Sequence, residues 1–227
     1  MENVGARGAG TWSAVLLAMV LAITAYVHFT VATQSSVPMP MVSDASEYFS
    51  YAYNLKNHGV YSDDLTWAGE TPPGGMHADS LRTPGYPLFL LAIPGLDASD
   101  AYLARVVRVQ AALGIGSVLL FFFVARRFLR PGWSHAAALL MGTNPHLANL
   151  ETNLLSETLF LFLLLASTLA TLVALDQRGR ARFIAAGLLW GLCALVRPTV
   201  LLLPPLLFLA SWPWPGARDL RSHGTPR

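Results

Sequence analysis

Charged residues are scarce in this sequence. Aspartate, glutamate, lysine and arginine make up 12% of the 227 residues, whereas hydrophobic residues make up 54%. Soluble domains carry roughly 25% charged residues, so this composition indicates an integral membrane protein. The formal net charge is only +2, and no basic cluster is dense enough to predict nucleic acid as a partner.

Cysteine is nearly absent, and so are the common catalytic motifs. The single cysteine, Cys193, lies in an apolar run and excludes an internal disulfide. There is no nucleophile elbow, phosphate-binding loop or paired-cysteine motif. No spacing among the histidines predicts a zinc site. We therefore expect no certain cofactor, and a divalent metal held by carboxylates stays open.

Long apolar runs are what the sequence does contain. A bilayer core about 30 Å thick needs roughly 20 helical residues. Runs near that length are 11–31, 104–128, 135–150 and 154–175. A further stretch, 183–212, is broken at Arg197-Pro198 and predicts either two short spans or one kinked helix. The fold class is therefore all-α, a polytopic membrane protein with about five to six transmembrane helices and a first outer loop with surface helices.

The placement of arginine predicts the orientation of these spans. Arginine clusters follow the second and fourth runs and close the chain, and such clusters favour the cytoplasm. The segment 34–103 then lies outside, with eight acidic residues against Lys56 and Arg82. We expect a multi-pass protein of the cell membrane with this organisation: a cytoplasmic N-terminus (1–10), a first transmembrane helix (11–33), an outer loop (34–103) with an amphipathic helix (43–57) and a short membrane-associated segment (84–94), a helix bundle (104–212) and a polar tail (213–227).

Two acids in the outer segment share one face of the predicted helix 43–57. Asp44, Glu47, Tyr48 and Tyr51 follow one another at helical spacing. A capping box, with Asp44 as the N-cap and Glu47 three residues later, explains the acids as well as catalysis does. The sequence leaves both interpretations open for Asp44, and Glu47 keeps the capping one.

Another acid begins an apolar helix on the same side of the membrane. Glu157 opens the run in "LLSETLFLFLLL", and acids in membrane helices are costly and usually functional. Helix capping by Asn153 or Ser156 is the alternative. Glu151, six residues earlier, is predicted to be solvated.

A lone arginine accompanies these acids. Arg197 stands between two apolar runs and must reach the interface, pair with an acid or bind an anion. With Arg82 it makes an outer pocket of arginines and acids, which suits a phosphate-bearing lipid and a proton transfer. A structural salt-bridge cluster is nearly as good an explanation. The GxxxG of Gly187 and Gly191 indicates close helix packing.

Five segments follow one another along the chain: a first membrane helix, then "DASEYFSYAYNLKNHGVYS", "RTPGYPLFLLAI", "NPHLANLETNLLSETLFLFLLL" and "AGLLWGLCALVRPTVLLLP". Their order resembles the N-terminal part of the GT-C membrane glycosyltransferases, in the branch of protein mannosyltransferases, aminoarabinose transferases and RgtA/B/C/D-like enzymes. The resemblance implies transfer of a sugar from a polyprenyl-phosphate donor to an acceptor outside the membrane, with inversion.

The resemblance also implies roles for individual residues. Asp44 matches the catalytic acid of the first outer loop, and Glu157 matches a second site carboxylate. Arg82, and less closely Arg197, match positions that meet the donor phosphate. Tyr48 and Tyr86 complete the expected substrate-binding set. Where some members hold a metal-binding acid, this chain has Leu81, which puts a metal in doubt.

The chain departs from the family in length, since members commonly run to about twice its size. The expected partners are a lipid-linked sugar donor, membrane lipids and a second chain that supplies the C-terminal half, but no nucleic acid. The main alternative function is a non-catalytic membrane subunit or inactive remnant. A small transporter, with Glu157 and Arg197 along its pathway, is a further one.

Overall fold

The structure is a computed structural model that describes residues 2–35, 37, 41–70, 73–203 and 206. Within these ranges the secondary structure is helical and contains no strand. The α-helices and 3-10 helices (η) are α1 (Glu2–Gln34), α2 (Asp44–His58), η1 (Thr66–Ala68), α3 (Gly85–Ala92), α4 (Asp100–Ala125), α5 (Pro131–Gly142), α6 (Pro145–Leu150), α7 (Glu157–Gln177), α8 (Arg180–Val196) and η2 (Pro198–Leu202).

Three helices in the described ranges are long and apolar enough to cross a membrane: Thr11–Gln34 of α1, Asp100–Ala125 and Glu157–Gln177. The helices α5 and α8 have 12 and 17 residues and extend about 18 and 26 Å, less than a bilayer core. The all-helical fold is therefore confirmed for the described residues, three of its helices suit a membrane by length and composition, and the count of five to six spans stays a prediction. The end of the stretch 183–212 and the tail 213–227 lie outside the described residues.

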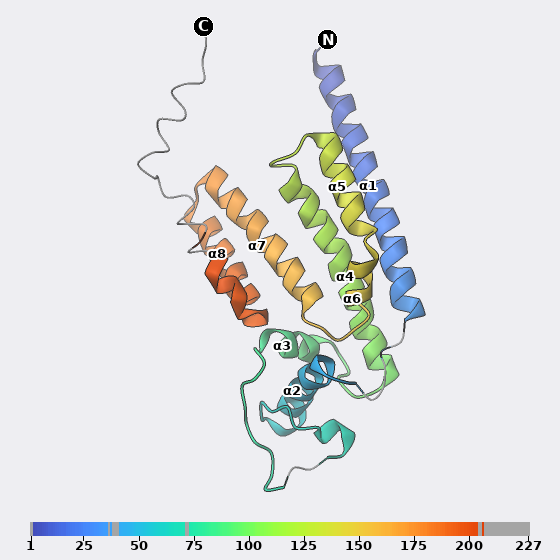
Figure 1. The fold of residues 1–227 in the computed structure, drawn as a ribbon. Helices are drawn as coiled ribbons and strands as arrows, with labels where there is room; N and C mark the ends of the chain where they lie inside the picture. Colours follow the sequence, from blue (N-terminus) through green and yellow to red (C-terminus); the bar gives the residue numbers. More distant parts are fainter. Residues whose placement is uncertain (1, 36, 38–40, 71–72, 204–205, 207–227) are drawn as a thin grey trace.

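The helices form a bundle with a helical cap at one end (Figure 1). Helices α1, α4, α5, α7 and α8 run side by side, and α2 and α3 lie beyond one end of them. The connections after α4 and after α7 lie at the opposite end, where α1 begins. The start of α7 and the end of α8 both lie at the end covered by α2 and α3. This arrangement brings the sequence-predicted site residues to one end of the bundle.

One predicted membrane span is wrong. The run 135–150 is not a single helix, because α5 ends at Gly142 and α6 begins at Pro145. The side chain of Asn144 accepts a hydrogen bond from the backbone amide of His146 at 2.9 Å and caps α6. Proline at the first position of a helix and asparagine before it favour such a new start.

The cap at the end of the bundle has an aromatic core of its own. Tyr48, Phe49 and Tyr51 of α2 are almost fully buried. The ring of Phe49 contacts Trp67, with centroids 5.5 Å apart, and Tyr102 of α4 at 6.1 Å. Because its rings pack against η1, α3 and α4, the helix α2 is fixed to the bundle.

Glycines allow close contacts between helices, although not at the predicted GxxxG. A Cβ atom added to Gly187 or to Gly191 would have no other atom of the described residues within 4 Å. The described residues therefore show no close helix packing at this motif. By contrast, a Cβ on Gly85 would lie 2.6 Å from the backbone of Leu195. Gly85 thus lets the start of α3 touch the end of α8.

Candidate active site

A groove opens where the helical cap formed by α2 and α3 meets the end of α8. Its volume is about 360 Å³. Three segments far apart in the sequence build it: the start of α2, the chain before α3 and the turn after α8. Thr83 joins two of them, because its hydroxyl donates to the carbonyl of Val196 at 2.9 Å. The groove is lined by Asp44, Tyr48, Leu81, Arg82, Thr83, Val196, Arg197, Pro198 and Thr199.

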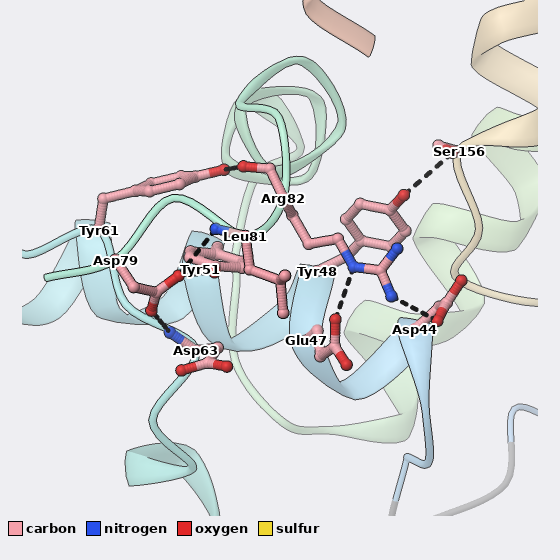
Figure 2. A network of polar contacts seen from close by, with 10 residues as sticks. All are labelled: Asp44, Glu47, Tyr48, Tyr51, Tyr61, Asp63, Asp79, Leu81, Arg82 and Ser156. Carbon is pink, nitrogen blue, oxygen red and sulfur yellow. Dashed lines mark hydrogen bonds and ion pairs between the residues drawn. The ribbon is translucent and has the colours of Figure 1, made fainter. Parts of the chain in front are cut away.

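Arg82 holds both acids of α2. Its Nη2 donates to Oδ1 of Asp44 at 2.5 Å, and its Nε donates to Oε2 of Glu47 at 2.6 Å. Its guanidinium also lies over the ring of Tyr48, 5.3 Å from the centroid. The hydrogen bond to Glu47 raises the pKa of Arg82. Figure 2 shows these three contacts converging on the guanidinium.

The capping box predicted for Asp44 and Glu47 does not form. Ser43 is the N-cap of α2 and makes no side-chain capping bond. Its φ of 54° is a conformation that residues other than glycine seldom adopt. The two carboxylates of Asp44 and Glu47 are therefore directed to Arg82 rather than to the helix backbone.

Arg197 holds the other predicted acid. Its Nη2 donates to Oε1 of Glu157 at 2.5 Å, and its Nε donates to Oγ of Ser156 at 3.1 Å. Its guanidinium lies 5.6 Å from the ring centroid of Phe160. Ser156 makes no capping bond to α7. Helix capping thus does not account for the position of Glu157 or of Ser156.

Ser156 joins the two halves of the site. Its hydroxyl is fully buried and lies 3.2 Å from the hydroxyl of Tyr48. Since its oxygen accepts from Arg197, its own proton is available to the tyrosine. Asp44 and Glu157 are thus linked through Arg82, Tyr48, Ser156 and Arg197. The sequence predicts Ser156 only as a capping residue, because a serine before a helix carries no signal for this bridging role.

Tyr86 does not line the groove. Its side chain is fully buried and its hydroxyl donates to Oε1 of Gln110 at 2.8 Å. Its ring meets Tyr48 edge to face, with centroids 4.9 Å apart. In this structure Tyr86 supports Tyr48 from behind, whereas direct substrate contact was expected.

The prediction that Glu151 is solvated is wrong. Glu151 is 2% exposed, and Nδ1 of His28 lies 2.8 Å from each of its carboxylate oxygens. The sequence shows these two residues 123 positions apart and gives no sign that α1 and the end of α6 meet.

The described residues do not fit a bound metal. They contain no group of three or more histidine, cysteine or acidic side chains placed to hold one. Asp79 is the acid nearest to Leu81 in sequence, but Oδ1 accepts from Tyr51 and from the amide of Leu81, and Oδ2 accepts from the amide of Asp63. These contacts, drawn in Figure 2, direct Asp79 away from the groove. We therefore derive no step through a metal.

The fold and this end-of-bundle site define a helical membrane protein with paired acids and arginines. Residues 98–224 match the family model described as dolichyl-phosphate-mannose-protein mannosyltransferase. This is more than half of the chain, and the protein belongs to this family of GT-C type membrane glycosyltransferases. Comparison with curated proteins and with solved structures found no match.

The matched region covers only one half of the site. It contains Ser156, Glu157 and Arg197, whereas Asp44 and Arg82 precede it. The family match therefore includes the Glu157 half by range only and assigns no role to its residues, and the geometry brings the Asp44 half next to it.

Proposed function

We propose that the protein transfers a sugar from a polyprenyl-phosphate donor to an acceptor hydroxyl on the outer side of the cell membrane. The observation that carries the proposal is the joined pair of acid–arginine contacts, Asp44 with Arg82 and Glu157 with Arg197. Both arginines and Asp44 line one groove, whereas Glu157 lies behind Arg197 and does not line it. Family membership supports the class of reaction. The strained backbone of Ser43, directly before Asp44, adds support because such strain clusters at active sites.

The arginines suit the donor phosphate. Among the described residues, Arg82 and Arg197 make their side-chain hydrogen bonds through Nε and Nη2, and Nη1 of each makes none. The Arg82 and Arg197 side chains are 27% and 37% exposed, so an anion in the groove can reach both. Guanidinium groups bind phosphate oxygens strongly. A donor phosphate between them would compete with the carboxylates for these hydrogen bonds.

Asp44 is then the base. As the acceptor oxygen bonds to the anomeric carbon of the sugar, the bond from that carbon to the phosphate oxygen breaks. The electron pair leaves with the polyprenyl phosphate, whose charge the two arginines stabilise. The proton of the acceptor hydroxyl passes to Asp44. Glu157 holds Arg197 in place beside the leaving phosphate.

The test compares Asp44→Asn with the wild-type protein. The amide keeps the size of the side chain but cannot take a proton, so we expect transfer from a labelled lipid-linked sugar to fall by about 100-fold or more. Glu70→Gln is the matched control, because Glu70 is an exposed acid of the same outer segment and makes no side-chain contact in the site. Equal transfer by wild type and Asp44→Asn, with both proteins folded, would sink the proposal.

A non-catalytic membrane subunit is the second candidate. It is favoured by the ion pairs themselves, because Asp44 and Glu157 are each neutralised by an arginine, as purely structural acids would be. In that case none of the variants changes sugar transfer, and Asp44→Asn lowers only the stability of the outer cap. The same experiment therefore separates the two functions.

A further inference from the structure

His28 and Glu151 form a buried, hydrogen-bonded pair inside the bundle. Their exposed fractions are both 2%. Nδ1 of His28 faces the carboxylate of Glu151 at 2.8 Å, and Nε2 faces the carbonyl oxygen of Gly142 at 3.1 Å. Both ring nitrogens thus meet oxygen acceptors. Either the imidazole is doubly protonated beside a carboxylate, or Glu151 carries the proton and donates it to Nδ1. In both forms one proton lies between Nδ1 and the carboxylate, a second proton is on Nε2, and the pair is neutral as a whole.

The pair fits only because α4 has a glycine beside it. A Cβ on Gly114 would lie 1.8 Å from Oε1 of Glu151 and 2.9 Å from Nδ1 of His28. Any larger residue at this position would displace the carboxylate. The geometry therefore depends on α1, α4 and the end of α6 together.

Glu151 also begins the segment that carries the candidate site. The side-chain amide of Gln110 donates to the carbonyl oxygen of Glu151 at 2.8 Å and to that of Asn153 at 2.7 Å. Gln110 is fully buried and accepts from Tyr86. Side-chain and backbone contacts thus fix residues 151–153. This segment ends at Asn153, three residues before Ser156 and four before Glu157.

A small cavity connects the pair with Glu157. His28, Gly114, Glu151, Glu157 and Thr158 are among its lining residues. Apolar side chains complete the lining, namely Val118, Met141, Leu147, Leu150 and Leu161, so the cavity does not suit a bound water. Oε2 of Glu157 is buried and has no hydrogen-bond partner among the described residues. The position of the Glu157 carboxylate therefore depends on its contact with Arg197 and on the packing of the segment that carries it.

We propose that His28 and Glu151 are positioning residues for Glu157, and that they act through the segment 151–157. With Glu151 fixed on His28 and the carbonyl oxygens of Glu151 and Asn153 fixed on Gln110, the start of α7 is held in place and Oε1 of Glu157 stays on Arg197. This inference rests on the proposed function for its effect on catalysis, although the position of the 151–157 segment can be measured without it.

The first test moves Glu151 without removing a polar group. In Gly114→Ala we expect kcat to fall about tenfold while KM changes less than twofold, because Asp44 and Arg82 are untouched and only Arg197, no longer held by Glu157, loses its place beside the leaving phosphate. Adding Glu151→Asp shortens the acid and should restore part of the lost kcat. Gly191→Ala is the control, since the site of its Cβ is open, and its kcat should equal that of the wild type. Wild-type kcat in Gly114→Ala would overturn the proposal.

The second test remains valid if Gly114→Ala does not fold. His28→Gln is compared with His135→Gln, another buried histidine whose Nε2 lies 3.0 Å from the carbonyl oxygen of Ser13. Amide hydrogen exchange across residues 152–157 should rise in His28→Gln only, and kcat should fall only there. Equal exchange in the two variants would overturn the inference. Faster exchange in His28→Gln together with normal transfer by Asp44→Asn would instead reject the proposed function and leave the positioning pair intact.

Discussion

At the scale of single residues, the groove depends on the shape of one guanidinium. Asp44 and Glu47 lie one turn apart on α2, and Arg82 meets them with two different nitrogens. A lysine ammonium is a compact point charge without this planar fork. Because the Asp44 side chain is 46% exposed, the ion pair contributes little stability. Its effect is to fix the orientation of Asp44 toward the groove.

A second polar cluster lies behind the site, around Asp63 and Asp79. Burial, and then the charge of Asp79, raise the pKa of Asp63. Burial acts against the charged form of Asp79 too, but hydrogen bonds from Tyr51 and from the amides of Leu81 and Asp63 outweigh it and lower the pKa of Asp79. Asp79 is therefore the ionised member and Asp63 the member that retains a proton to higher pH.

This difference predicts a pH-dependent stability. Asp63 binds its proton more tightly in the folded chain than in the unfolded one, so its contribution is present in acid and is lost as the pH rises above about 4. Asp63→Asn keeps a neutral donor next to Asp79 at every pH. We expect its melting temperature to exceed that of the wild type by about 1–2 °C at pH 7, with no difference below about pH 4.

Thermal unfolding followed between pH 4 and 7 checks this prediction. Glu70→Gln serves again as the control, because it removes an exposed acid of the same segment and should shift the melting temperature equally at all pH values. An Asp63→Asn protein that melts lower than the wild type at pH 7 would show that the charged form of Asp63 is the stabilising one.

Glu157 and Arg197 were predicted as site candidates because charges next to apolar runs are costly without a function. Asp44 and Arg82 were predicted from the family resemblance, and Asp44 also from the helix face that it shares with Glu47. The pairing among them was beyond the sequence. Whether Arg82 meets Asp44 or a solvent ion depends on the packing of α2 on α3. The burial of Glu151 was missed for the same reason, since its partner His28 lies in a helix that hydropathy marks only as a membrane anchor.

At the scale of helices, hydropathy predicted that a helix is present better than it predicted where the helix begins and ends. The first apolar run, predicted as 11–31, lies in a helix that extends from Glu2 to Gln34. The run 135–150 is mostly apolar, and its division into α5 and α6 follows from the local chemistry of Asn144-Pro145. A hydropathy window averages the contribution of Asn144 and Pro145 with that of many neighbours, whereas the start of a helix depends on these two residues alone.

The contact between α3 and α8 gives a prediction at this scale. In Gly85→Ala the new Cβ would overlap the backbone of Leu195, which cannot move aside as a flexible side chain would. We expect a loss of about 1–3 kcal/mol in the free energy of unfolding, or a melting temperature lower by roughly 2–10 °C. Sugar transfer should fall as well, because Thr83 and Arg197 flank this contact.

The control for Gly85→Ala is Gly187→Ala, in which the added Cβ meets open space. Alanine is the better helix former, so this variant should melt no lower than the wild type. Circular dichroism melts of the two proteins in the same detergent make the comparison. If both variants melt together, the close approach of α3 and α8 does not contribute to the fold.

At the scale of the whole molecule, charge is divided between the two ends of the bundle. Arg126, Arg127 and Arg130 follow α4, and Arg178, Arg180 and Arg182 lie around the start of α8, with Arg127 paired to Asp176. These turns are at the end of the bundle where α1 begins (Figure 1). The acids of the outer segment and the groove are at the other end. Such an asymmetry of arginine favours the cytoplasm for the first end and the outer side for the groove.

Cysteine labelling in intact cells tests that orientation. The natural Cys193 is buried, so the wild-type chain supplies a low background for a membrane-impermeant maleimide. Glu70→Cys places an exposed thiol in the outer segment, and Gln177→Cys places one at the end of α7, where the side chain is also exposed. If the groove faces outward, Glu70→Cys reacts in intact cells, and Gln177→Cys reacts only after the membrane is permeabilised. The reverse pattern would put Asp44 and Arg82 in the cytoplasm, and a donor presented on the outer leaflet could not reach them.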